Sequence, residues 1–206
     1  PLQVERCLDG AGIAFFFAPT FHPSMKHAGP TRKDLGVRTA FNLLGPLTNP
    51  AGATRQLVGV PRPEHTELVA RAFALLGSDH AWVVHGADGL DEISTTGYTK
   101  VSECRNGVVN TFYVHPVEHG ISRADMAELR GGSADDNAAI ALSVLKGAKG
   151  APRDVVVLNA GAALLVAGRV KTLRAGVTRA IESLDSGSAS RKLEMMVELS
   201  HQSVEE

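Results

Sequence analysis

The sequence predicts an α/β domain in which a mostly parallel sheet is flanked by helices. A short apolar run at 56–60, a helical pattern at 63–76 and a second apolar run at 81–84 form the strand–helix–strand order that is typical of a parallel sheet. Helical patterns then occupy most of the chain from residue 135 onwards. Because 44% of the 206 residues are hydrophobic, the chain has enough apolar material for a packed core.

The front of the chain has less regular patterns. Residues 2–11 resemble the tail of a helix already under way, and the chain begins at Pro1 without an initiator methionine. The aromatic-rich run at 13–17 has the length and composition of a fully buried strand. Residues 22–35 follow a helical pattern that a Gly-Pro pair interrupts, and the apolar stretch at 39–44 runs into a second Gly-Pro turn signal.

The middle of the chain predicts a hairpin, and the end predicts helices. Two strands are expected at 100–104 and 108–114, because the Asn-Gly pair between them favours a tight hairpin turn. The preceding helix, 63–76, is closed by Gly77, a common helix stop. Four further helices are expected at 135–146, 155–166, 170–184 and 190–201.

Composition argues against several classes of partner. The formal net charge is -1 and no basic stripe is apparent, so neither nucleic acid nor a membrane surface is an expected partner. The longest apolar run, 13–18, is far shorter than the roughly 20 residues that a transmembrane helix needs. Cys7 and Cys104 form no CxxC pair, which argues against a disulfide framework or a zinc site. We therefore expect a soluble, cytoplasmic protein.

The first segment with chemical potential is residues 22–32. On a continuous helix, His22, Met25 and Arg32 would share one face and point into one cleft. A guanidinium beside an apolar wall suits an aromatic carboxylate, because the guanidinium binds the acid and the apolar wall packs on the ring. The alternative is a surface helix whose basic residues are simply solvated.

Two further segments could bind ligands. The stiff turn at 42–50, which contains Pro46, could approach a ligand closely, or could merely reverse the chain. Asp91 and Glu92, with Asp88 nearby, follow a predicted strand at the edge where α/β sheets bind ligands. Their oxygens suit Mg²⁺ carrying a phosphate substrate, although a solvated acidic turn is the competing interpretation.

A glycine-rich turn at 131–135 resembles a phosphate-holding loop before a helix, but a cap by Ser133 is the simpler role for it.

Taken in order, these pieces resemble one known family, the anthranilate phosphoribosyltransferases. The resemblance covers almost the whole chain, and its first block is the most specific part. It rests on four strings: FFFAPTFHPSMKHAGPTRKDLGVRTAFNLLGPLTNPA, HGADGLDEIS, GGSADDNAA and LNAGAALLVAG. It implies the α/β C-terminal domain that these enzymes share in architecture with nucleoside phosphorylases.

The resemblance also implies an activity and a site. The family transfers the phosphoribosyl group of phosphoribosyl pyrophosphate (PRPP) to the amino group of anthranilate, releases pyrophosphate and requires Mg²⁺. By position, Arg32 falls on the residue that holds the anthranilate carboxylate, while Met25 and Pro46 fall on its aromatic channel with His22 beside them. Asp91 and Glu92 fall on the acidic pair that coordinates Mg²⁺.

This reaction needs little general acid–base catalysis, and no residue is assigned as a general acid or base. Loss of pyrophosphate builds positive charge on the ribose and negative charge on the leaving group, so metal ions and positioning can supply most of the catalysis. His85 and Asn42 could contact a substrate directly or hydrogen-bond to another site residue.

The chain departs from the family at its front. The family's helical N-terminal domain, its GTGGD-type loop for pyrophosphate and its KHGN-type segment have no counterpart in the 206 residues. We therefore expect residues 1–206 to be the C-terminal, catalytic α/β domain, truncated at its N-terminus, with little or no turnover alone. The family dimerises through the N-terminal domain, so the isolated chain is expected to be a monomer or a loose aggregate.

Three other interpretations stay open at this point. A pyrimidine nucleoside phosphorylase would share the architecture, although the LGPLTNP block and the upstream arginine fit an aromatic acid better. A non-enzymatic paralogue of the same fold could bind nucleic acid, against the charge balance. The third interpretation is a relic without a ligand.

Overall fold

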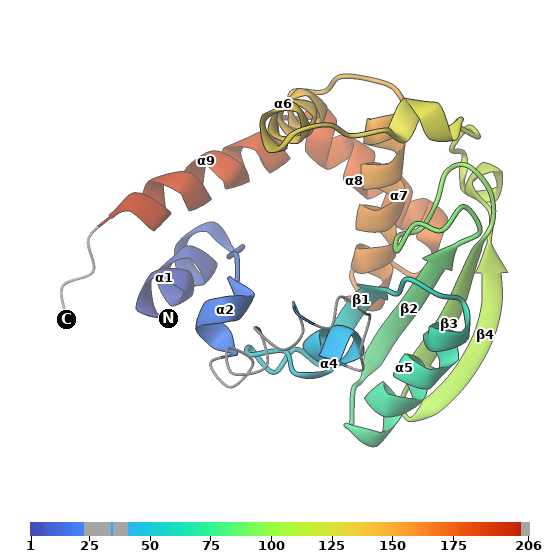
Figure 1. Ribbon diagram of the computed structural model, residues 1–206. Coiled ribbons are helices and arrows are strands. Elements are labelled where there is room, and N and C mark those ends of the chain that lie inside the picture. Colours follow the sequence, from blue (N-terminus) through green and yellow to red (C-terminus); the bar gives the residue numbers. More distant parts are fainter. Residues whose placement is uncertain (23–33, 35–40, 203–206) are drawn as a thin grey trace. The chain divides into compact units, whose positions relative to one another are not determined.

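The computed structural model describes residues 1–22, 34 and 41–202. Two compact units are present: Pro1–Gly52 together with Gly187–Glu206, and Ala53–Ser186. We call them the first and the second unit and describe each by itself (Figure 1). The expectation of one domain over residues 1–206 stays a prediction.

The first unit is helical in its described residues. It contains α1 (Leu2–Ala11), α2 (Ala18–Phe21), α4 (Phe41–Leu47) and α9 (Ser188–His201). Helix α1 packs along α9, where Cys7 Sγ lies 3.7 Å from the Met196 carbonyl oxygen that it contacts. Gly10 allows this approach, because a Cβ there would lie 2.6 Å from Leu199 Cδ1. The helices expected at 2–11 and 190–201 are confirmed.

The strand expected at 13–17 is wrong. These residues form neither helix nor strand, and the side chains of Phe15 and Phe17 are 72% and 57% exposed. A short apolar run becomes a buried strand only when a neighbouring strand completes its backbone hydrogen bonds. The described residues of the first unit contain no strand, so residues 13–17 have no such neighbour within their own unit.

The second unit is built on one four-stranded sheet in the order β1-β2-β3-β4. Its strands are β1 (Arg55–Gly59), β2 (His80–Gly86), β3 (Thr99–Arg105) and β4 (Val108–Val114). Strands β1 and β2 are parallel, and α5 (Glu64–Leu75) connects them, which confirms the predicted strand–helix–strand unit. Because β3 and β4 form the predicted hairpin, the other two pairings are antiparallel. The sheet is therefore mixed rather than mostly parallel in the described part.

The two residues between β3 and β4 adopt the backbone conformation that a tight hairpin turn requires. Asn106 and Gly107 have φ angles of 50° and 78°. Both central residues are thus left-handed, as a type I′ turn requires, and its twist matches that of the flanking strands.

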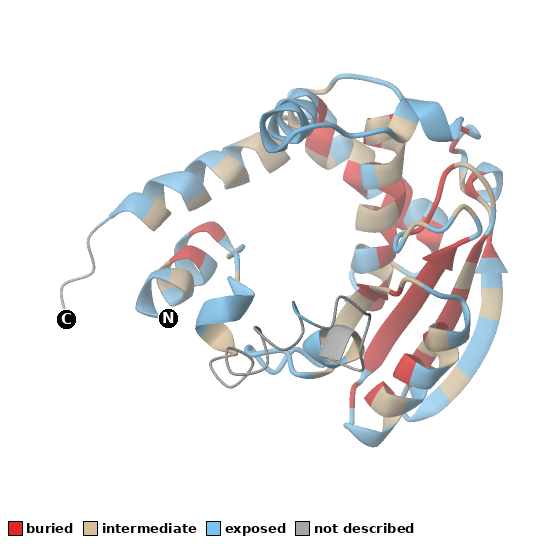
Figure 2. Cartoon of the chain, in the orientation of Figure 1, coloured by how far each residue is buried: buried red, intermediate tan, exposed pale blue. Residues whose placement is uncertain are grey.

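Helices cover the sheet, and β2 lies at the centre of the core. Helix α5 packs on β2 and β3, and α7 (Ala151–Val166) packs on β1 and β2. Every residue of β2 is buried, as Figure 2 shows by its unbroken red colour. Successive side chains of a strand point to opposite faces, so complete burial means that both faces of β2 are covered.

The backbones of α7 and α8 (Leu173–Asp185) come into contact where they cross. A Cβ on Gly176 would lie 2.2 Å from the Gly161 carbonyl oxygen, so the two glycines let the helices touch. This crossing holds α7 in place, which matters because α7 carries a residue of the site described below.

The remaining elements of the second unit are peripheral. They are η1 (Pro116–His119), η2 (Met126–Leu129) and α6 (Ala134–Leu145). Ser133 caps α6 by accepting a hydrogen bond from the Asp136 backbone N–H at 3.2 Å, the role expected for it.

Two further features of the described residues concern the cysteines and the helices. Cys7 and Cys104 are both free and buried, as small core residues are. None of the described helices combines the length and the apolar character that crossing a membrane would need.

Candidate metal and substrate site

The acidic pair lies on the turn that follows β2. Strand β2 ends at Gly86, whose N–H donates to the Leu90 carbonyl oxygen at 2.8 Å and closes a tight loop. Asp91 and Glu92 follow directly, and both are exposed. They thus occupy the carboxyl end of a parallel strand, as the sequence predicts.

Asp88 supports this turn from inside. Its carboxylate accepts hydrogen bonds from the hydroxyls of Ser94 and Thr96, the latter at 2.6 Å, and from the Leu90 N–H at 3.0 Å. Burial opposes the charge of Asp88, but these hydrogen bonds outweigh it and lower the pKa of Asp88 below its usual value. The ionised Asp88 carboxylate therefore stabilises the turn at neutral pH, and this stabilisation is lost only as the pH falls through the lowered pKa of Asp88. With its oxygens so engaged, Asp88 positions the turn rather than serving as a ligand.

Gly59 fixes the turn from the side of β1. A Cβ on Gly59 would lie 1.5 Å from the Asp91 carbonyl oxygen, so the backbone of Asp91 rests on the bare Cα of β1's last residue. Only glycine permits two backbone segments to approach this closely.

Asn159 fixes the turn from the side of α7. Its Oδ1 accepts from the Ile93 N–H at 2.9 Å, and its Nδ2 donates to the Ile93 carbonyl oxygen at 2.9 Å. Nδ2 also donates to the Val155 carbonyl oxygen in its own helix at 3.0 Å. Ile93 is fully buried, so Asn159 satisfies both backbone groups of the residue next to Glu92.

The electrostatics of the pair favour a cation. Although Glu92 as a whole is exposed, partial burial of its carboxyl group raises its pKa, and the neighbouring Asp91 carboxylate raises it further. A divalent ion would relieve this repulsion. The described residues contain no group of three His, Cys, Asp or Glu side chains placed to hold a metal, and Asp91 and Glu92 offer two carboxylates on one turn. That fits Mg²⁺, which commonly binds one or two carboxylates and completes its shell with water and substrate phosphates.

His85 makes a backbone contact beside the pair. It is 9% exposed, and its Nδ1 lies 2.9 Å from the Val60 carbonyl oxygen. A carbonyl can only accept, so Nδ1 donates this hydrogen bond. His85 therefore ties the residue after β1 to the end of β2.

The predicted acceptor residues are only partly visible. Arg32 and Met25 lie outside the described residues. His22 follows α2 and Pro46 lies inside α4, and both are half-buried members of the first unit. Asn42 lies in α4, but its side chain is outside what the structure describes.

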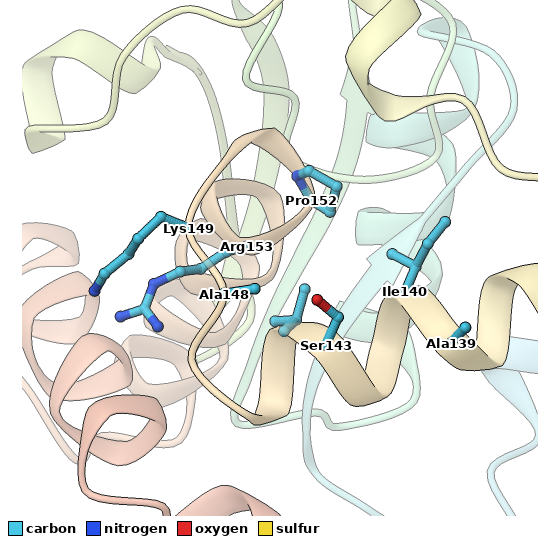
Figure 3. Close-up of a pocket in the computed structure, with 8 residues that line it drawn as sticks. Ala139, Ile140, Ser143, Ala148, Lys149, Pro152 and Arg153 are labelled. Atoms are coloured by element: carbon cyan, nitrogen blue, oxygen red, sulfur yellow. The ribbon is translucent and has the colours of Figure 1, made fainter.

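Two hollows of the second unit border α6. One, of about 280 Å³, lies between α6 and α7 and is drawn in Figure 3. Its two basic side chains, Lys149 and Arg153, point away from α6 and bind Asp185 of α8, with Nζ–Oδ1 at 3.2 Å and Nη2–Oδ1 at 2.7 Å. These ion pairs with Asp185 join the start of α7 to α8. The other hollow, of about 320 Å³, has Glu92 among its mostly apolar lining residues.

Gly59 and Asn159 were not among the predicted site residues, although the sequence contains a weak signal for each. Gly59 stands at the end of a strand pattern, where glycine marks a close backbone approach. Asn159 is the polar residue of the apolar LNAGAALLVAG block, and a polar group in a core helix needs a partner.

Comparison with known proteins decides the family. A sequence model described as "Glycosyl transferase family, a/b domain" matches residues 1–190. The chain belongs to this family. The anthranilate phosphoribosyltransferase of Symbiobacterium thermophilum is 55% identical over 201 residues, which are 98% of this chain and 59% of the relative. This chain thus spans about three fifths of that relative's length.

Solved structures agree with the family and with the fold. The anthranilate phosphoribosyltransferase of Thermus thermophilus matches 97% of this chain and 59% of its own, with a TM-score of 0.89 and 42% identity. The enzyme of Saccharomyces cerevisiae in complex with PRPP and Mg matches 91% of this chain and 54% of its own, with a TM-score of 0.83 and 31% identity. The predicted α/β class, with helices flanking the sheet, is confirmed.

Proposed function

We propose that this chain supplies the metal pair and the acceptor residues of an anthranilate phosphoribosyltransferase. The reaction joins the ribosyl anomeric carbon of PRPP to the anthranilate nitrogen and releases pyrophosphate. The observation that carries the proposal is the exposed Asp91–Glu92 pair at the carboxyl end of β2, held by Gly59 and Asn159. The names of the relatives and the yeast complex with PRPP and Mg support it.

In the proposed reaction, Asp91 and Glu92 would hold Mg²⁺ together with the pyrophosphate group of PRPP. When bound, the metal supplies positive charge that stabilises the negative charge developing on pyrophosphate. Asp88, Gly59 and Asn159 keep the two carboxylates in place. This rigidity avoids reorganisation as the charge develops.

The acceptor half of the proposal rests on Arg32. Its planar guanidinium binds the anthranilate carboxylate, and Met25, Pro46 and His22 border the aromatic ring. Holding the weakly basic amine in line with the anomeric carbon replaces acid–base assistance, because orientation alone lowers the barrier substantially. We also propose that the parent protein is cytoplasmic and dimerises through the family's helical N-terminal domain, and that the isolated 206-residue chain is a monomer or a loose aggregate.

The metal pair is tested by Mn²⁺ binding, with Mn²⁺ standing in for Mg²⁺. The double change Asp91→Asn and Glu92→Gln removes both charges with little change in shape, so we expect Mn²⁺ affinity to fall at least about tenfold. Electron paramagnetic resonance of free Mn²⁺ measures this without depending on turnover. Asp135→Asn, on an exposed helix turn, is the matched control and should bind like the unchanged chain. Equal affinity in all three chains contradicts the metal assignment.

The acceptor assignment is tested with the native fluorescence of anthranilate. Arg32→Ala should weaken anthranilate binding by about tenfold or more, because a bidentate charge-assisted contact is lost. Arg32→Lys keeps the charge but not the planar fork, so it should restore only part of the affinity. Unchanged anthranilate affinity in Arg32→Ala removes Arg32 from the acceptor site, while the metal result above stands separately.

A further inference from the structure

A polar pocket lies at the opposite end of the sheet from the acidic pair. It has a volume of about 680 Å³, within the range of about 300–1,000 Å³ that ligand pockets occupy. Among its lining residues, Arg55 is the first residue of β1 and His80 is the first residue of β2. Arg105 is the last residue of β3, and Lys171 lies in the connection between α7 and α8. Strand β2 separates this pocket from Asp91, and at about 3.3 Å per residue its length places the two roughly 20 Å apart.

Two of the pocket's cations have no protein partner in the described part of the chain. Arg105 and Lys171 are both exposed, and neither forms an ion pair or a side-chain hydrogen bond there. Arg55 is held only loosely, with Nη1 3.5 Å from the Val166 carbonyl oxygen and Nε 4.0 Å from Asp79 Oδ2. Three positive groups therefore line one pocket of a chain whose formal net charge is -1.

The nearby carboxylates do not neutralise this charge. Glu103 binds inward, accepting from Trp82 Nε1 at 2.9 Å and lying 2.6 Å from His80 Nε2. Asp79 accepts a hydrogen bond from the Thr54 hydroxyl at 2.8 Å and, among the described residues, is the one carboxylate that lines the pocket. Three cations face this single carboxylate, so the pocket keeps a net positive charge.

We propose that this pocket binds a small anion that bears phosphate groups. Guanidinium groups match phosphate oxygens with paired N–H donors, and an ammonium group adds a compact charge. The Asn106 side chain, at the rim, offers a further amide donor. The site is separate from the proposed phosphoribosyl transfer, because it shares no residue with the acidic pair and needs no metal.

The test uses tripolyphosphate as the probe and the whole 206-residue chain. Calorimetric titration in EDTA, at constant ionic strength, removes any divalent-ion contribution from Asp91 and Glu92 and holds charge screening fixed. We expect one binding event. Lys171→Gln and Arg105→Gln should each weaken it about tenfold, since each removes a charge-assisted contact. Lys146→Gln removes the same charge from an exposed position that does not line this pocket and should leave affinity unchanged.

The outcomes separate this site from the proposed activity. Asp91→Asn should leave tripolyphosphate binding in EDTA unchanged, whatever it does to Mn²⁺ binding. Absence of binding overturns the proposal. So does an equal loss in Lys146→Gln and Lys171→Gln, which would mean that only overall charge matters.

Discussion

Replacing Asn159 with leucine is expected to lower the free energy of unfolding by about 3 kcal/mol. The side chain satisfies both the N–H and the carbonyl oxygen of Ile93, and Ile93 is fully buried. Leucine is close in size but has no polar atoms, so both backbone groups would be left without a partner. Each unsatisfied buried group costs about 1–3 kcal/mol, part of which the added apolar burial offsets. Urea denaturation measures the change.

Asn137 provides a matched control for Asn159. It too binds both polar groups of one residue, accepting from the Gly132 N–H at 3.0 Å and donating to its carbonyl oxygen at 3.2 Å. Gly132, however, is exposed, so water can replace these bonds. Asn137→Leu should therefore cost less than about 1 kcal/mol. Equal losses in the two variants would mean that Asn159 acts only as an ordinary helix residue.

Asn159→Leu should also affect the metal pair under native conditions. Ile93 directly follows Glu92, so loss of the clamp frees the carboxylates that Asn159 positions. We expect the folded Asn159→Leu variant to bind Mn²⁺ more weakly than the unchanged chain when both are measured without denaturant. A stability loss with unchanged Mn²⁺ affinity would limit Asn159 to a structural role.

Replacing Gly59 with alanine is expected to destabilise the second unit by about 3 kcal/mol or more and to disturb the acidic turn. The new Cβ would lie 1.5 Å from the Asp91 carbonyl oxygen, and no rotamer change can relieve this clash, because the oxygen belongs to the backbone and the backbone fixes the position of a Cβ. Overpacking in a core typically costs about 1–3 kcal/mol, and a backbone clash lies at or above that range. Thermal unfolding, followed by Mn²⁺ titration of the folded variant, measures both effects.

Gly97 is the matched control for Gly59. It lies in the same unit, and a Cβ there would meet nothing within 4 Å. Its φ is outside the left-handed region, so alanine should be tolerated or slightly stabilising by restricting the unfolded chain. If Gly59→Ala unfolds at the same temperature as Gly97→Ala, the close packing of Asp91 on β1 does not limit stability.

Local patterns predicted most elements of the second unit and the place of its acidic pair. The helix expected at 63–76 is α5 (Glu64–Leu75), and the Asn-Gly pair forms the hairpin turn. These predictions succeed because they depend on residues a few positions apart: apolar periodicity, a cap or a left-handed turn. The edge on which Asp91 and Glu92 lie follows from the same reasoning, since they come directly after a buried strand.

The residues that surround this pair come from distant parts of the chain and could not be predicted from local patterns. Ile93 and Asn159 are 66 residues apart, and no local pattern specifies that they meet. The run at 13–17 has the composition of a buried strand, yet its aromatic rings are largely exposed, because composition cannot say whether a partner strand is present. Likewise, the cations of the pocket at the end of the sheet where β1 and β2 begin come from segments far apart in the chain. Local sequence patterns are thus enough to predict the kind of fold and the residues with chemical potential, whereas contacts between distant segments determine which residues hold them in place.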